Sequence, residues 1–74
     1  MEIDYKALGK RIKICRINQN MAQERLAYKA GITPTHCSNI ETGSTKVSLN
    51  TLVNIANALS VSVDDILCYK LKIF

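Results

Sequence analysis

The residue types that perform nucleophilic catalysis or bind metal ions are few in this chain of 74 residues, and they are scattered. Cys15, Cys37 and Cys68 include no CxxC pair, and the single histidine, His36, stands directly before Cys37. Because adjacent residues on a helix point about 100° apart, His36 and Cys37 would not readily share a metal ion. An odd number of widely spaced cysteines also argues against a disulfide framework. We therefore expect reduced thiols, with no metal and no cofactor.

The paired carboxylates Asp64 and Asp65 are the remaining candidates for acid–base chemistry. They follow Ser62, a residue type that caps helices, and the helix dipole favours carboxylates in a first turn. No nucleophile–base arrangement, glycine-rich phosphate loop or small-molecule motif accompanies them. The sequence therefore predicts that the protein is not an enzyme.

Length and charge restrict the partners further. With 47% hydrophobic residues, the chain suits one small globular domain and is too short for two lobes around a cleft. It has no apolar run near the roughly 18 residues of a membrane helix, and its acidic start is unlike a secretory signal. The net charge is +4, and residues 1–30 hold seven of the ten basic residues. This favours a polyanionic partner, no membrane partner and a cytoplasmic location.

Helical spacing of apolar residues dominates the sequence and predicts an all-α fold. We expect five helices, over residues 4–19, 22–30, 34–42, 49–59 and 63–68. Residue types that cap or end helices stand at these boundaries: Asp4, Gly31, Thr33, Gly43, Ser48 and Ser62. The fourth helix should direct five residues inward: Leu49, Leu52, Ile55, Ala56 and Leu59.

Residues 69–74 form a tail whose apolar and basic residues alternate. That spacing is typical of a strand, but it also fits a helix end followed by a disordered terminus. An isolated strand needs a partner, so a second copy of the chain is one candidate.

The segment 23–42, QERLAYKAGITPTHCSNIET, meets the stereochemical requirements of a helix-turn-helix unit. The fifth position, where the helices cross, is the small Ala27, and the ninth, which needs positive φ, is Gly31. The five positions that should be apolar are all apolar: Leu26, Ala30, Ile32, Cys37 and Ile40.

Over residues 4–68 the sequence resembles the lambda- and Cro-repressor-like helix-turn-helix proteins, also called the xenobiotic-response-element (XRE) family. The stretches GKRIKICR, AQERLAYKAGIT, SNIETG and SLNTLVNIANALSVSVDDIL carry the resemblance. It implies a compact five-helix DNA-binding domain at residues 1–68, with the helix-turn-helix in helices two and three. Ala22 departs from the family, which often has a Ser or Thr cap at this position.

The resemblance also implies which residues contact double-stranded DNA. In repressors, the second helix of the motif enters the major groove, where each base pair presents a distinct pattern of donors and acceptors. The base-contacting residues would be Thr35, His36 and Asn39. The backbone contacts would be Gln23, Thr33, Ser44, Thr45 and Lys46. Gln23 could instead only cap its helix, and Lys46 could be an ordinary loop lysine.

Arg16 and Glu41 match a pair that is structural in the family. The resemblance implies a partly buried ion pair that fixes the recognition helix against the first helix. Such a pair is costly to break from one side.

Together these features predict a small stand-alone transcriptional regulator, a repressor of bacterial or phage type that is associated with the nucleoid and binds a two-fold-symmetric operator. Family symmetry implies a homodimer, and the expected surface is the fifth helix with the tail: Ile66, Leu67, Tyr69, Leu71 and Ile73. The alternative is a protein-interaction module, such as an antitoxin-like partner. Ile14 and Ile17, which lie outside the core-facing positions of the first helix, would then contact the other protein.

Overall fold

The protein is described by a computed structural model that covers residues 2–67. Five helices follow one another along this part of the chain: α1 (Tyr5–Asn18), α2 (Gln23–Ala30), α3 (Pro34–Thr42), α4 (Leu49–Leu59) and α5 (Val63–Leu67). No strand occurs among the described residues, which confirms the all-α prediction. The tail, with its expected strand or dimer contact, lies outside them.

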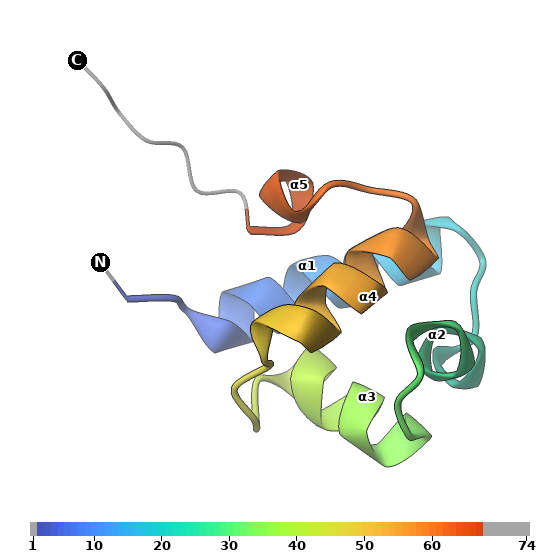
Figure 1. Ribbon diagram of the computed structural model, residues 1–74, viewed down its shortest axis with the longest axis horizontal. Coiled ribbons are helices and arrows are strands. Elements are labelled where there is room, and N and C mark those ends of the chain that lie inside the picture. Colours follow the sequence, from blue (N-terminus) through green and yellow to red (C-terminus); the bar gives the residue numbers. More distant parts are fainter. Residues whose placement is uncertain (1, 68–74) are drawn as a thin grey trace.

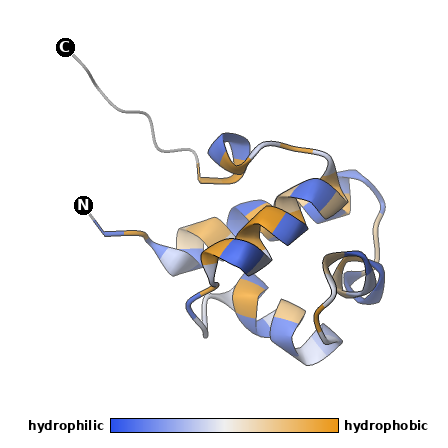
Figure 2. Ribbon diagram, in the orientation of Figure 1, coloured by the Kyte–Doolittle hydropathy of each residue, from blue (hydrophilic) through white to orange (hydrophobic). Residues whose placement is uncertain are grey.

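The helices enclose one hydrophobic core (Figure 1). Helix α1 packs against α3, α2 packs against both α3 and α4, and α5 packs against α1 and α4. Figure 2 shows hydrophobic and hydrophilic residues on different sides of the helices, as expected when each buries one face. The largest fully buried side chains come from all of the first four helices: Leu8, Ile12, Leu26, Cys37, Ile55 and Leu59.

Helix ends are fixed by the predicted residues. The backbone N–H of Ala7 donates to Asp4 Oδ1 at 3.1 Å, and that of Thr51 donates to Ser48 Oγ at 3.2 Å. At α5, Asp65 N–H donates to Ser62 Oγ at 3.1 Å while Ser62 N–H donates to Asp65 Oδ2 at 3.2 Å. The reciprocal bonds form a capping box, so Asp65 has a structural role.

Arg11 of α1 and Gln19, the residue that caps the C-terminal end of α1, also cap the C-terminal ends of other helices. Gln19 Nε2 donates to the carbonyl oxygen of Leu59, the last residue of α4, at 2.7 Å. Arg11 Nη1 donates to the carbonyl oxygen of Leu67, the last residue of α5, at 3.3 Å. Both bonds satisfy carbonyl groups that have no partner within their own helix.

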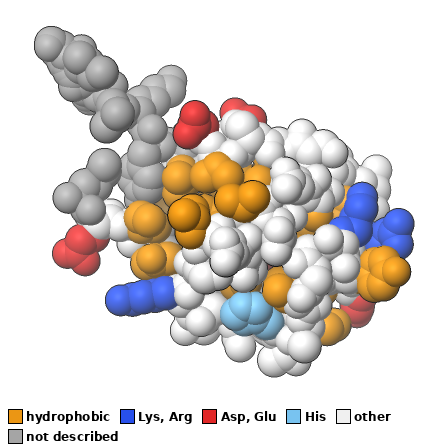
Figure 3. All heavy atoms as spheres, viewed as in Figure 1, with side chains coloured by type: hydrophobic (Ala, Val, Ile, Leu, Met, Phe, Trp, Pro, Cys, Tyr) orange, Lys and Arg blue, Asp and Glu red, His pale blue; other side chains and the backbone are white. Residues whose placement is uncertain are grey.

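The prediction that Leu49 faces the core is wrong, because this residue is 71% exposed. Leu49 is the first residue of α4 and precedes the turn that packs on the rest of the protein. Val53, one turn further along, is also exposed. Hydrophobic side chains gather on the face toward the viewer in Figure 3, where α4 lies in Figure 1. No helix in the described part of the chain is both long and apolar enough to cross a membrane.

Candidate nucleic-acid interface

Helices α2 and α3 are joined by a tight turn in which Gly31 has the left-handed conformation, with φ of 72°. A Cβ added to Gly31 would meet no atom within 4 Å, so positive φ, and not crowding, favours glycine here. The Ile32 N–H donates to the Ala27 carbonyl at 2.9 Å and closes the turn. Thr33 then caps α3 by accepting a 3.0 Å hydrogen bond from the His36 backbone N–H.

Helix α1 lies unusually close to the C-terminal end of α3 at Gly9. A Cβ on this residue would lie only 2.7 Å from the Glu41 carbonyl oxygen and would also collide with the carbonyl oxygen of Ile40. Glycine therefore permits the backbones of α1 and α3 to approach each other. The sequence did not mark Gly9 as a special position, because its periodicity says nothing about distances between helices.

Arg16 and Glu41 form an ion pair that joins the same two helices. Arg16 Nε lies 2.7 Å from Glu41 Oε2, and Arg16 Nη2 lies 3.1 Å from Oε1, which makes the contact bidentate. The third guanidinium nitrogen donates to the Met21 carbonyl at 2.7 Å. The hydrogen bond with Glu41 is the main cause of a raised pKa for Arg16.

Gln23, the first residue of α2, is directed at the same carboxylate. Its Nε2 donates to Glu41 Oε1 at 3.0 Å, so Glu41 links α1, α2 and α3. No buried side-chain nitrogen or oxygen among the described residues lacks a hydrogen-bond partner. Gln23 is predicted from the sequence to contact the DNA backbone or to cap α2, and its contact with Glu41, 18 positions away, had no signal in the sequence.

The side chain of Cys37 is buried on the inner side of α3, and its Sγ lies 3.9 Å from Glu41 Oε2. Burial, together with the negative charge of Glu41, raises the pKa of Cys37 from 9.0 to about 11. The thiol is therefore protonated at neutral pH and is a packing group, not a nucleophile. No group of three or more potential ligands that could hold a metal ion occurs in residues 2–67.

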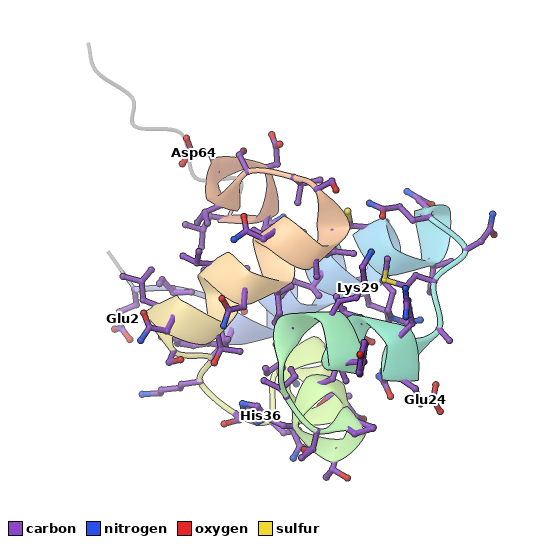
Figure 4. All side chains as sticks on the ribbon, turned by 45° about the vertical axis from the view of Figure 1, so that its right-hand side comes forward. Glu2, Glu24, Lys29, His36 and Asp64 are labelled. Atoms are coloured by element: carbon purple, nitrogen blue, oxygen red, sulfur yellow. The ribbon has the colours of Figure 1, made fainter. Side chains whose placement is uncertain are left out.

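The opposite side of α3 is polar and open to solvent. Thr35 and Asn39 are exposed, and His36 is half-buried. The side chains of Thr35 and Asn39 make no hydrogen bond within the described protein, so their donors and acceptors are available to a partner. Figure 4 shows His36 at the lower edge of the molecule, on the α3 side.

The predicted backbone-contacting residues come from three places. Gln23 begins α2 and contacts Glu41 near the C-terminal end of α3, and the cap residue Ala22 makes no side-chain hydrogen bond, so the first N–H groups of α2 are not satisfied by a cap. Thr33 stands at the other end of α3 as its N-cap. The loop that follows Gly43 holds the exposed Lys46 and the half-buried Thr45. Ser44 Oγ lies 2.8 Å from Thr42 Oγ1, so the loop begins with a hydroxyl pair.

A family model described as "Helix-turn-helix" matches residues 12–66. This chain belongs to the helix-turn-helix family. The control protein C.BamHI of Bacillus amyloliquefaciens is 37% identical over 60 residues, which cover 80% of this chain and 74% of that protein. The family assignment confirms the resemblance that the sequence indicated.

Solved structures show the same architecture as this helix-turn-helix protein. The restriction-modification controller protein C.AhdI of Aeromonas hydrophila matches with a TM-score of 0.84 at 26% identity, over 88% of this chain and 98% of that one. The P22 c2 repressor, solved in complex with a synthetic operator, matches with a TM-score of 0.76 at 27% identity, over 81% and 91% of the two chains. The five-helix repressor-like fold is thereby confirmed.

The relatives also define the class of activity. They are transcriptional regulators, control proteins and a repressor rather than enzymes. This helix-turn-helix protein is accordingly a DNA-binding regulator, the class of protein that the resemblance implied.

Proposed function

We propose that the protein is a small transcriptional repressor that binds a two-fold-symmetric operator by inserting α3 into the major groove. The exposed, unbonded side chains of Thr35 and Asn39 carry this proposal. They lie four residues apart and therefore share one face of α3, opposite the buried Cys37 and Ile40. The P22 c2 repressor, whose fold this chain shares, was solved with an operator.

The side chains on this face have the chemistry for base recognition. The Asn39 amide can pair with an adenine through two hydrogen bonds, and the Thr35 methyl group can contact a thymine methyl group. His36 can donate a hydrogen bond to an acceptor on guanine or thymine. Helix α3 would then discriminate between sequences without positive charge of its own.

Backbone contacts would hold α3 in register. The α2 N-terminus, with free N–H groups and a favourable dipole, suits a phosphate, and Gln23 is the first residue of this helix. Thr33, the N-cap of α3, would make a separate backbone contact. Ser44, Thr45 and Lys46 would contact further phosphates from the loop that follows α3. Because Gln23 is bonded to Glu41 in the free protein, only its remaining amide hydrogen and its backbone N–H are available to DNA.

The two-fold symmetry requires a homodimer, and the geometry suggests its surface. Ile66 is only 2% exposed and packs in the core, so its assignment to the dimer surface was wrong. Tyr69, Leu71 and Ile73 lie outside the described residues. Leu49 and Val53 offer an exposed apolar pair on one face of α4, and Leu67 is half-buried at the end of α5. We take this face as the dimer contact of a domain spanning residues 1–68.

A second candidate function rests on α1. Ile14 and Ile17 are 48% and 52% exposed, which suits a protein-interaction module such as an antitoxin-like partner. Selection from a random duplex library separates the two functions. A repressor should enrich a short palindromic site whose half-sites lie about one helical turn apart. In the cell, it would act on DNA in a bacterial cytoplasm. Enrichment of no sequence would contradict the operator proposal.

A further inference from the structure

Lys6 lies beside the turn that ends α3, although 37 residues separate it from Gly43 in the sequence. A Cβ added to Gly43 would lie 2.7 Å from both the Cα and the Cγ of Lys6. Gly43 also has a φ of 77°, which favours glycine independently. The start of α1 and the α3–α4 loop are therefore neighbours, at the lower left of Figure 1.

The charge of Lys6 has no partner among residues 2–67. Lys6 is exposed, and in the described part of the chain it makes no ion pair or side-chain hydrogen bond. The nearest carboxylate along the chain, Asp4, accepts the Ala7 N–H that caps α1. From α3, the carboxylate of Glu41 is buried against Arg16 and is not available to Lys6.

Lys46 lies in the loop that follows the same turn. It is exposed and follows Gly43 by three residues, so the Cα atoms of the two are at most about 11 Å apart. It too makes no ion pair or side-chain hydrogen bond within the described residues. Two lysines from distant parts of the sequence thus lie near the turn that ends α3, where the hydroxyl groups of Thr42 and Ser44 form a pair.

We propose that Lys6 and Lys46 form a two-lysine clamp on the DNA backbone at the C-terminal end of α3. The proposal rests on the operator binding proposed above and adds a contact from α1 to it. Phosphate contacts fix the orientation of a recognition helix but carry no sequence information. With Thr33 at the N-terminal end of α3, a clamp at its C-terminal end would help to prevent α3 from rotating in the groove.

The salt dependence of binding tests the clamp, because each neutralised phosphate contributes about −0.9 to the slope of log K against log salt concentration. We would compare Lys6→Gln and Lys46→Gln with the full-length wild type on the selected operator and on an unrelated duplex. Each variant should reduce the magnitude of the slope by about 0.9. It should also weaken binding to both duplexes by similar factors.

Lys29→Gln is the matched control, because it removes the same charge from an exposed lysine in the last turn of α2. Figure 4 shows Lys29 on the opposite side of α2 from His36. This control should retain the wild-type slope, and Lys6→Arg should retain it as well.

A Lys6→Gln protein with the wild-type slope, or with the same change as Lys29→Gln, would overturn the clamp while leaving operator binding intact. A wild-type protein that binds neither duplex would overturn both proposals. Circular dichroism of each variant would establish that it is folded at the temperature of measurement.

Discussion

The carboxylate of Glu41 binds the guanidinium of Arg16 at two points, with N–O distances of 2.7 and 3.1 Å, and is almost completely buried. It also accepts a hydrogen bond from Gln23. One acidic group at the end of α3 therefore organises the three helices that position the candidate DNA-binding surface.

Replacing Arg16 with alanine should lower the free energy of unfolding by about 3–5 kcal/mol, because Glu41 would remain buried without its cationic partner. Urea denaturation would measure the loss. The double variant Arg16→Met, Glu41→Leu should be more stable than Arg16→Ala, since neither charge is then left unpaired. A loss below about 1 kcal/mol, as for an exposed ion pair, would contradict the structural role.

Gly9→Ala should destabilise the protein by about 1–3 kcal/mol, because the new Cβ would collide with the backbone of α3. Helix propensity alone predicts the opposite sign, since alanine is favoured over glycine within a helix by about 1 kcal/mol. Thermal or urea unfolding of this single variant therefore separates the two effects. A stabilised Gly9→Ala protein would show that the helices are not in close contact at this position.

The pH dependence of stability should reveal the buried thiol of Cys37. Its pKa is about 11 in the folded protein and 9.0 ordinarily, so the unfolded chain loses this proton first as the pH rises. The stabilisation is complete below pH 9 and is lost between about pH 9 and 11, on the order of 2 kcal/mol in total. Denaturation of wild type and Cys37→Ala across this range would measure it. Parallel curves for the two proteins would contradict the prediction.

Leu49→Asp or Val53→Asp should convert a dimer into monomers, because either change places a charge in the proposed apolar contact. Sedimentation at micromolar concentration would measure the change. Ile17→Asp is the matched control, as it places the same charge at a similarly exposed residue on α1. A dimer that survives both α4 variants would exclude this face of α4.

The helices and most of the core were predictable because they depend on local signals. Asp4, Thr33 and Ser48 mark helix starts by their own chemistry, and apolar residues at helical spacing predicted the buried face. Contacts between elements could not be predicted in this way. Three contacts depend on how whole helices pack: the close approach of Gly9 to α3, the Gln23–Glu41 hydrogen bond, and the proximity of Lys6 to Gly43.

Leu49 shows the limit of periodicity at helix ends. It has the spacing of an inward residue, but it is the first residue of α4 and is exposed, whereas Leu52, three residues further along the helix, is buried. Among the candidate DNA contacts, the exposure of Thr35 and Asn39 was predictable, because Cys37 and Ile40 mark the opposite, buried side of α3. Their contact with bases stays a prediction.

The most direct test of base recognition by α3 is the affinity of wild type and Asn39→Ala for the selected operator and for each single-base-pair variant of it. We expect the Asn39→Ala protein to lose about 1–3 kcal/mol of binding free energy on the operator and to discriminate no longer at one base pair in each half-site. Discrimination should remain at all other positions. An Asn39→Ala protein that keeps the wild-type preference at every base pair would contradict base recognition by Asn39.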